Sequence, residues 1–387
     1  MLRNLRKIFA SVEPDSNSIV SLVDELLFEA AKSEASDIHF EPVSDGIVVK
    51  YRIDGVLNII EKLPANLTEN IITRLKVLGS LLTYRNDIPQ EGRLEVGSEF
   101  KGRVIDQRIS TFPTIYGQRA VIRLFYQHKE LNQLGQLGFS GNILQKLQDV
   151  STQSQGVILI TGPAGSGKST TLAAMIRNIL KNNPGKSIVT IEDPVEIRID
   201  NATQVQIEPF GEMSFPKALR SLLRQDPQVL MIGEIRDVET ARIVIEAGLT
   251  GHLLMSTMHS GSCSGALLRL LEMGIEPYQI TSSVSAVVNQ RLVRRLCESC
   301  KTKNDDGSYC PKGCEKCFDT GFRGRVLIAE LVELDGNLRK AILDRADIET
   351  IEELLQKRGH MTLEHNGREL VAKGITTVSE LEKVCQI

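Results

Sequence analysis

A glycine-rich segment near the middle of the chain has the residue types and spacing of a phosphate-binding loop. It reads GPAGSGKST, follows the apolar run GVILIT and precedes a stretch that predicts a helix. Glycines let backbone N–H groups close around phosphate oxygens, a lysine there reaches the terminal phosphates, and the next serine holds Mg²⁺. The helix N-terminus adds a favourable dipole for the anion. We therefore expect ATP at Gly162, Pro163, Ala164, Gly165, Ser166, Gly167, Lys168, Ser169 and Thr170, with Mg²⁺ on Ser169.

Carboxylates follow two later apolar runs. Glu192, Asp193 and Glu196 come after SIVTI, and Glu234 and Asp237 come after QVLMIG. The carboxyl ends of parallel strands face the ligand crevice, so these acids are expected near the phosphates, where they hold a metal or orient water. Helix N-termini also favour acids, which is a sufficient explanation for Glu196 and Asp237. Glu192 and Glu234 remain the catalytic candidates.

A fourth apolar run has a histidine at each end, His252 before it and His259 after it. A lone histidine at the end of a strand is more often structural than catalytic. Because His259 is expected beside the terminal phosphate, a role in ATP hydrolysis is as well supported for it as a structural role. We treat His259 as a catalytic candidate and His252 as a weaker one.

Five of the seven cysteines lie between positions 297 and 317. Cys297 and Cys300 form one CxxC pair, Cys314 and Cys317 form another, and Cys310 breaks the symmetry. Two such pairs with thirteen residues between them are typical of a four-sulfur zinc site. A disulfide is disfavoured in a reducing compartment, and no thioredoxin-like context supports redox chemistry. A closed site leaves no position for water, so we expect Zn²⁺ here to stabilise the fold.

The composition limits the class of protein. The 387 residues suffice for two domains, or three with a small one. The apolar runs have the length of strands and are too short to cross a bilayer, and the start of the chain lacks the apolar core of a signal peptide. We expect a cytoplasmic protein with reduced cysteines. A net charge of -3 and the absence of tryptophan disfavour a nucleic-acid partner.

The pattern of helices and strands divides the chain. Residues 1–128 predict a small mixed α/β domain, with an amphipathic helix followed by short alternating strands. Residues 129–138 are polar and aperiodic, as in a linker. From 139 to 387, helices alternate with short apolar strands, which indicates a mostly parallel, doubly wound sheet. The cysteine segment at 291–330 interrupts this pattern, and 331–387 predict a helical tail.

Taken together, these segments resemble the secretion-ATPase superfamily of type II secretion and type IV pilus assembly. The resemblance covers nearly the whole chain, and its motifs occur in the family's order: ASDIHFEP, YRIDGVL, IPQEGR, DQRISTFPTIYGQRAVIRL, GPAGSGKSTT, TIEDPVE, LRSLLRQDP, MIGEIRD, GLTGHLLMSTMHS and GCEKCFDTGFRGR. It implies an α/β fold, with a small PAS-like N-terminal domain and a RecA-like ATPase domain. It also implies a homo-hexameric motor, peripherally attached to the inner membrane, that acts on a membrane platform protein.

The resemblance assigns roles to single residues. Glu192 matches the acidic box, and Glu234 matches the Walker B position that orients or activates water. His252 and His259 match the histidine box. The motif GCEKCFDTG places the second zinc knuckle on Cys314 and Cys317, which leaves Cys310 as the spare cysteine.

Arginines of the N-terminal domain face the phosphates in this family. Arg108 in DQRIS and Arg123 in VIRLF match those positions, and Arg93 in PQEGR is a weaker candidate. A guanidinium stabilises charge on the γ-phosphoryl oxygens. Without the resemblance, arginines that solvate one face of a sheet would be the default explanation.

Three departures from the family pattern stand out. The histidine box continues with Ser260, Gly261 and Ser262 in place of Thr-Asn-Asp, and DPD before Walker B reads DPQ. The extra N-terminal docking domain of many assembly ATPases is expected to be absent. The competing hypotheses are a pilus retraction motor, a nucleic-acid translocase and a scaffold that binds nucleotide without hydrolysis. Retraction ATPases generally lack the tetracysteine motif, which favours secretion or assembly.

Overall fold

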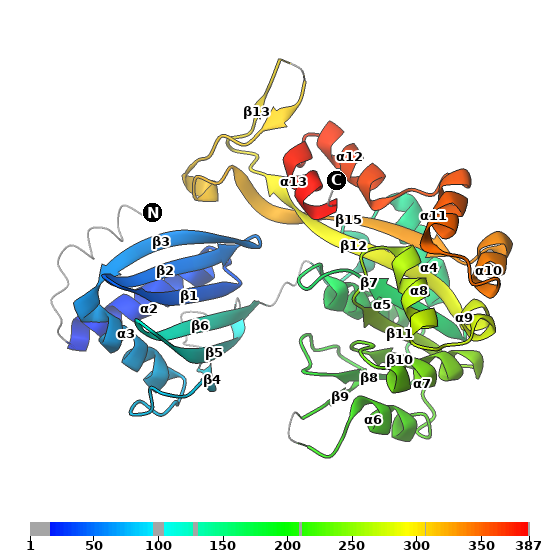
Figure 1. The fold of residues 1–387 in the computed structure, drawn as a ribbon, viewed down its shortest axis with the longest axis horizontal. Coiled ribbons are helices and arrows are strands. Elements are labelled where there is room, and N and C mark those ends of the chain that lie inside the picture. The colour runs from blue at the N-terminus through cyan, green and yellow to red at the C-terminus, as the bar shows by residue number, and fades with distance from the viewer. Residues whose placement is uncertain (1–15, 96–103, 127–130, 209–210, 306, 386–387) are drawn as a thin grey trace. The chain divides into compact units, whose positions relative to one another are not determined.

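A computed structural model describes residues 16–95, 104–126, 131–208, 211–305 and 307–385. The chain forms two compact units, Met1–Lys129 and Glu130–Ile387. Figure 1 shows the first unit in blue and cyan and the second in green to red.

The first unit is an antiparallel sheet with two helices on one face. Its six strands run in the order β3-β2-β1-β6-β5-β4. Their bounds are β1 Asp37–Val43, β2 Gly46–Ile53, β3 Val56–Pro64, β4 Gln90–Leu94, β5 Val104–Thr114 and β6 Gly117–Tyr126, and the helices are α2 Ser16–Lys32 and α3 Ala65–Leu78. This is the small mixed α/β fold that the sequence predicts.

Alternation along the strands determines which face of this sheet is covered. On β1, Ile38 and Phe40 belong to the core that includes the apolar stripe of α2, such as Leu22 and Leu26. Successive side chains point to opposite faces, so His39 lies on the face away from the helices. That second face carries the charged residues of β4, β5 and β6.

The second unit is built on a seven-stranded sheet in the order β15-β12-β7-β11-β10-β8-β9. All neighbours pair in parallel except β12 and β15, which are antiparallel. The strands are β7 Gly156–Thr161, β8 Ile188–Glu192, β9 Thr203–Gln206, β10 Val229–Ile232, β11 Leu253–Met258, β12 Val284–Leu296 and β15 Phe322–Glu333. A short hairpin of β13 Thr302–Lys303 and β14 Tyr309–Cys310 lies outside this sheet.

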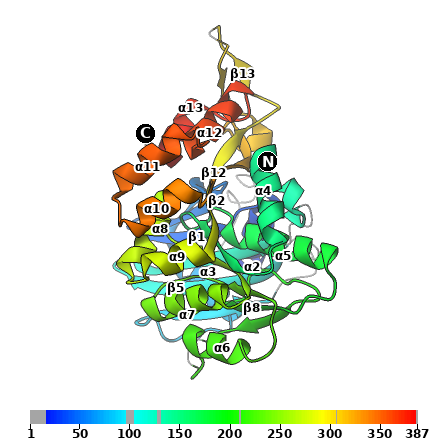
Figure 2. The same ribbon diagram turned by 90° about the vertical axis from the view of Figure 1, so that its right-hand side faces the viewer.

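Helices cover both faces of this sheet, as Figure 2 shows. They are α4 Gly141–Ser151, α5 Lys168–Asn182, α6 Phe215–Leu222, α7 Val238–Leu249, α8 Cys263–Glu272, α9 Pro277–Ser283, α10 Gly336–Leu343, α11 Ile348–Lys357, α12 Leu363–Ala372 and α13 Val378–Cys385. One core contains residues of α4 and α5, such as Leu147 and Met175. The other contains residues of α6 to α11, such as Val244 and Leu267. The doubly wound sheet is therefore confirmed.

The described residues of the segment expected to be a linker, 131–138, pack within this second unit. A 3-10 turn, η3, spans Leu134–Gln136, and Leu134 is only 2% exposed. Leu134 packs in the core that includes α4 and α5. Leu137, partly buried, packs against the same core, so two leucines attach this segment to the second unit.

The C-terminal helices pack against the ends of β12 and β15. Leu363 of α12 and Leu381 of α13 form a small core with Val293 and Ile328 of those strands. Arg294 of β12 also donates two hydrogen bonds to the Glu380 carboxylate, at 2.7 and 2.6 Å. Among the described residues, no helix is both long and apolar enough to cross a membrane.

Candidate functional site

The glycine-rich loop joins the end of β7 to the start of α5, which begins at Lys168. Gly162, Gly165 and Gly167 have φ angles of 147°, 73° and 89°, values that favour glycine. A Cβ at Gly162 would lie 2.5 Å from the Gln290 carbonyl oxygen, so a side chain cannot fit there. The three glycines thus permit this turn between β7 and α5, and at Gly162 the neighbouring strand β12 leaves no room for a side chain.

Lys168 folds back over this loop. Its Nζ donates to the carbonyl oxygens of Gly162 and Pro163, both at 2.9 Å. Burial lowers the pKa of Lys168, whereas the nearby charges of Glu234 and Glu196 raise it. Neutral carbonyl partners are weak competitors for a cation, so this ammonium group is available to phosphate oxygens.

Gln290 of β12 holds the loop from the side, a residue that the sequence analysis did not single out. It is fully buried, its Nε2 donates to the Ser166 carbonyl at 2.8 Å, and its Oε1 accepts from Thr171 Oγ1 at 3.0 Å. These two bonds fix the loop to the first turn of α5. The only signal in the sequence is a glutamine inside an apolar strand, where an unpaired amide would be costly.

The two candidate carboxylates lie at neighbouring strand ends. Glu192 ends β8, and Glu234 follows β10. Glu192 is only 7% exposed and accepts from Thr190 Oγ1 at 2.7 Å and from Gln204 Nε2 at 3.0 Å. Burial raises the pKa of Glu192 despite these two bonds. Its carboxylate is therefore a stronger base than an exposed glutamate.

Glu234 lies between two basic side chains. Arg236 pairs with one of its oxygens, and His259 Nε2 lies 3.7 Å from the other. Arg236 also lies 3.9 Å from Asp193. The Thr257 hydroxyl donates to the Gly233 carbonyl at 2.7 Å, which fixes the Walker B turn to β11. The fold thus brings Lys168, Glu234 and His259 into one electrostatic group, and adds Arg236, which the sequence analysis missed.

Other candidates lie elsewhere or have structural partners. His252 precedes β11 at the edge of the sheet where β7 begins, and its carbonyl accepts from Gly156 N at 3.0 Å. It is therefore at the opposite end of the strand from His259. Asp237 caps α7 by accepting from the Thr240 N–H at 2.8 Å. In the altered histidine box, Ser262 caps α8 and accepts from Gly265 N at 3.0 Å.

The three arginines of the first unit form one row across the sheet. Arg93 of β4 lies opposite Arg108 of β5, which lies opposite Arg123 of β6. They occupy the face without helices, with side chains 72%, 46% and 67% exposed. Arg93 and Arg108 share Asp106 as an ion-pair partner. The register therefore places all three guanidinium groups next to one another.

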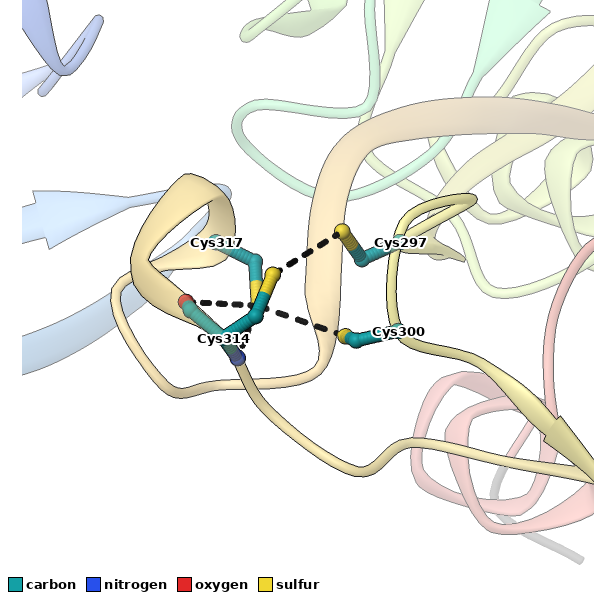
Figure 3. Close-up of side chains that lie close together, drawn as sticks. All are labelled: Cys297, Cys300, Cys314 and Cys317. Carbon is teal, nitrogen blue, oxygen red and sulfur yellow. Dashed lines mark hydrogen bonds between the residues drawn. The ribbon is translucent and has the colours of Figure 1, made fainter.

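Four cysteines form a compact cluster between β12 and β15 (Figure 3). The Sγ atoms of Cys297 and Cys314 are 3.9 Å apart, and Cys317 Sγ lies 3.7 Å from those of Cys300 and Cys314. Four sulfurs at about 2.3 Å from one Zn²⁺ in a tetrahedron are about 3.8 Å apart, so the spacing fits that ion. Backbone N–H groups of Cys314 and Gly321 donate to Cys317 Sγ, both at 3.2 Å.

Cys310 lies outside this cluster. It belongs to the β13–β14 hairpin, and its Sγ lies 3.0 Å from Thr302 Oγ1. The sulfur also donates to Asn304 Oδ1 at 3.3 Å. Of the five cysteines in the segment, Cys310 is the one without a place in the four-sulfur group.

Comparisons with known proteins find relatives over nearly the whole chain. The sequence model of the family "Type II/IV secretion system protein" matches residues 12–383. The "Putative type II secretion system protein E" of Escherichia coli (strain K12) is 39% identical over 388 residues, covering 96% of this chain and 78% of that protein. The "Type IV pilus assembly ATPase PilB" of Thermus thermophilus is 38% identical over 389 residues, covering 96% of this chain and 43% of that protein.

Solved structures share the architecture. The pilus retraction motor PilT with bound ADP matches with a TM-score of 0.63 and 24% identity, over 93% of this chain and 96% of that chain. At this identity the likeness concerns the fold.

Proposed function

The chain belongs to the type II/IV secretion system protein family, and on that premise we propose that it hydrolyses ATP to drive type II secretion or type IV pilus assembly. The observation that carries the proposal is the grouping of Lys168, Glu234 and His259 beside a glycine loop. A cation for phosphate oxygens and a carboxylate for water are the minimum that phosphoryl transfer to water requires.

Each residue has a separate task in this proposal. Lys168 binds the terminal phosphate oxygens, and Ser169 would hold Mg²⁺, which neutralises charge on those oxygens. Glu234 orients the attacking water, because Arg236 and His259 fix its two oxygens. Glu192 accepts the proton of that water, a task for which its raised pKa is suited.

The donor set fits a nucleotide phosphate. Three loop glycines have positive φ, and the buried Ser166 Oγ has no hydrogen-bond partner among the described residues. An unpaired buried hydroxyl is costly, so a ligand that bonds it would be favoured.

We propose that the protein works as a ring of identical subunits in which the arginine row completes the nucleotide site. Arg93 and Arg108 share Asp106, while Arg123 and Arg52 share Asp37. Two aspartates therefore serve four arginines, which leaves net positive charge for an anion. A guanidinium on the γ-phosphoryl group stabilises the transition state. Family resemblance supports the hexamer.

Three further parts of the proposal rest on the resemblance and the cysteine geometry. The four clustered sulfurs hold a structural Zn²⁺, since their spacing fits a tetrahedral site. The protein acts in the cytoplasm and docks on an inner-membrane platform protein. The tetracysteine cluster favours secretion or assembly over pilus retraction.

The test measures Mg-ATP hydrolysis per subunit as protein concentration increases. We expect the specific activity to increase with concentration in the wild type, and to fall at least tenfold in Arg108→Ala, since one charged contact to the transition state is lost. Arg119→Ala is the matched control, because Arg119 lies on the same sheet face and also pairs with a carboxylate, Glu41 at 3.3 Å, but lies outside the arginine row. Constant specific activity that is insensitive to Arg108→Ala would exclude the ring site. Absence of hydrolysis at every concentration would contradict the motor.

A further inference from the structure

Arg291 is a half-buried cation on β12 whose hydrogen-bond partners are all neutral. Its Nη1 donates to Asn289 Oδ1 at 2.6 Å and to the Gln290 carbonyl at 3.0 Å, and its Nη2 donates to the Gly261 carbonyl at 2.8 Å. Within the described part of the chain, no carboxylate oxygen lies within 4.0 Å of its nitrogens. Burial lowers the pKa of Arg291. A partly buried guanidinium without an anionic partner is unusual, because its desolvation is uncompensated.

Cys385 and the buried carboxylate of Glu330 raise the pKa of Arg291 from further away, but burial raises the pKa of the Cys385 thiol and other groups engage Glu330. Glu330 accepts from Asn289 Nδ2 at 3.0 Å and from the Cys263 and Leu363 backbone N–H groups at 3.2 and 3.3 Å. Asn289 therefore connects the two charges and holds Arg291 in a fixed orientation. The guanidinium is positioned without being neutralised.

The guanidinium group of Arg291 lies next to the phosphate loop. A Cβ at Gly162 would lie 3.2 Å from Arg291 Nη1, so the guanidinium packs against the first glycine of the loop. Its charge also acts on Lys168, lowering the pKa of that ammonium group. Two cations near one loop, each bonded only to carbonyl and amide oxygens, repel each other until an anion joins them.

Arg291 also bonds the segment that follows His259. Its Nη2 holds the Gly261 carbonyl at 2.8 Å, and Asn289 Nδ2 donates to the same oxygen at 2.9 Å. The neighbouring Ser260 carbonyl accepts from Thr161 Oγ1, at the end of β7, at 3.0 Å. Arg291 therefore lies between the phosphate loop and the histidine segment, on β12, the strand that pairs with β7.

We propose that Arg291 binds the γ-phosphate of ATP from within the same subunit as the phosphate loop, and that it exchanges the Gly261 carbonyl for a phosphate oxygen when it does so. This inference rests on the proposed ATPase function and adds a residue to it. The histidine segment is then held by Arg291 only in the absence of the γ-phosphate, which makes that segment responsive to hydrolysis. Charge-assisted bonds to phosphate are stronger than bonds to a carbonyl, which favours the exchange.

The test compares the affinities of Arg291 variants for ADP and for a non-hydrolysable ATP analogue, each with Mg²⁺. Arg291→Gln retains a donor for the Gly261 carbonyl but removes the charge, and Arg291→Lys retains the charge but loses the fork. We expect Arg291→Gln to bind the ATP analogue about tenfold or more weakly and ADP with less than about a threefold change. Arg291→Lys should recover part of the loss. Arg295→Ala is the control, because Arg295 lies on the same strand with an exposed side chain that pairs with Glu298 at 3.5 Å.

The outcomes separate this inference from the proposed function. Equal loss of ADP and ATP-analogue affinity in Arg291→Gln, or no loss, would overturn the γ-phosphate contact while the wild type still binds and hydrolyses ATP. Failure of the wild type to bind either nucleotide would overturn both proposals. The thermal unfolding midpoint of each variant shows whether the fold is intact. If Arg291→Gln unfolds, Arg291→Lys decides alone: a selective loss of affinity for the ATP analogue is expected, and unchanged affinities for both nucleotides would overturn the contact.

Discussion

The phosphate loop and the cysteine cluster lie along the same strand, β12, which passes Gln290 beside the loop and ends at Leu296 directly before Cys297. At the loop, Lys168 and Arg291 bond neutral carbonyl oxygens. At the cluster, the four sulfurs lie within 4.8 Å of one another, and two backbone N–H groups donate to Cys317 Sγ.

The difference follows from what each region has to do. In a site that binds and releases an anion, the cations need partners that the anion can displace. Carbonyl oxygens, which bind cations more weakly than phosphate does, are such partners. A structural metal site has to fill every coordination position of the ion with a protein ligand, so its sulfurs face one another and leave no open position. One region is therefore expected to change during turnover and the other to remain fixed.

Removing the loop cation should have the largest effect. We expect Lys168→Ala to lower the rate of ATP hydrolysis about 1000-fold, because the variant loses a charged contact to the transferred phosphoryl group. Phosphate release under saturating Mg-ATP measures it. Lys181→Ala, in the exposed last turn of the same helix, is the matched control. Activity within tenfold of the wild type would remove Lys168 from the site.

Glu234→Gln should separate binding from chemistry. The amide keeps the shape but cannot orient water as a carboxylate does, so we expect about 100-fold slower hydrolysis with nucleotide affinity retained. Equilibrium binding and single-turnover rates measure the two parts. Glu239→Gln is the control, since its exposed carboxylate pairs only with Arg220, at 2.7 Å, among the described residues. Normal turnover by Glu234→Gln would exclude its catalytic role.

The cluster should respond to a cysteine change in stability and metal content. We expect Cys314→Ser to lose Zn²⁺ and to lower the unfolding midpoint by several degrees, because metal affinity contributes to folding free energy. Cys310→Ser should change neither quantity, since Cys310 Sγ contacts Thr302 and Asn304 instead. Elemental analysis and thermal unfolding measure both variants. Folded wild-type protein without zinc would contradict the metal site.

The smallest effect is expected where β12 meets the tail. There, burial tends to raise the pKa of Glu380, but hydrogen bonds from Arg294 and Lys383 outweigh it and lower this pKa below its usual 4.5. A lowered pKa means that the pair stabilises the protein above that value and that this stability is lost as pH falls through the folded pKa. We expect Glu380→Gln to cost about 1–3 kcal/mol at pH 7 and to match the wild type in acid. Chemical denaturation at several pH values measures it, and a pH-independent difference would contradict the ion pair.

The features that the sequence predicted correctly depend on short segments. The apolar runs of the parallel strands are local properties, so the doubly wound sheet could be predicted. The positive φ angles of Gly162, Gly165 and Gly167 also suit their residue type, while nucleotide binding at this loop stays a prediction. Two closely spaced CxxC pairs likewise indicated which four sulfurs would meet. Each of these features depends on residues that lie close together in the sequence.

The tertiary structure alone decided which distant side chains share a site. Pairing of β12 with β7 brought Gln290 and Arg291 to the loop, and nothing in their own segment indicates a phosphate neighbour. The register of β4, β5 and β6 aligned three arginines that the motifs had located only one by one. A local pattern specifies the conformation of a segment, whereas the pairing of strands far apart in the chain depends on how all segments bury their apolar faces together.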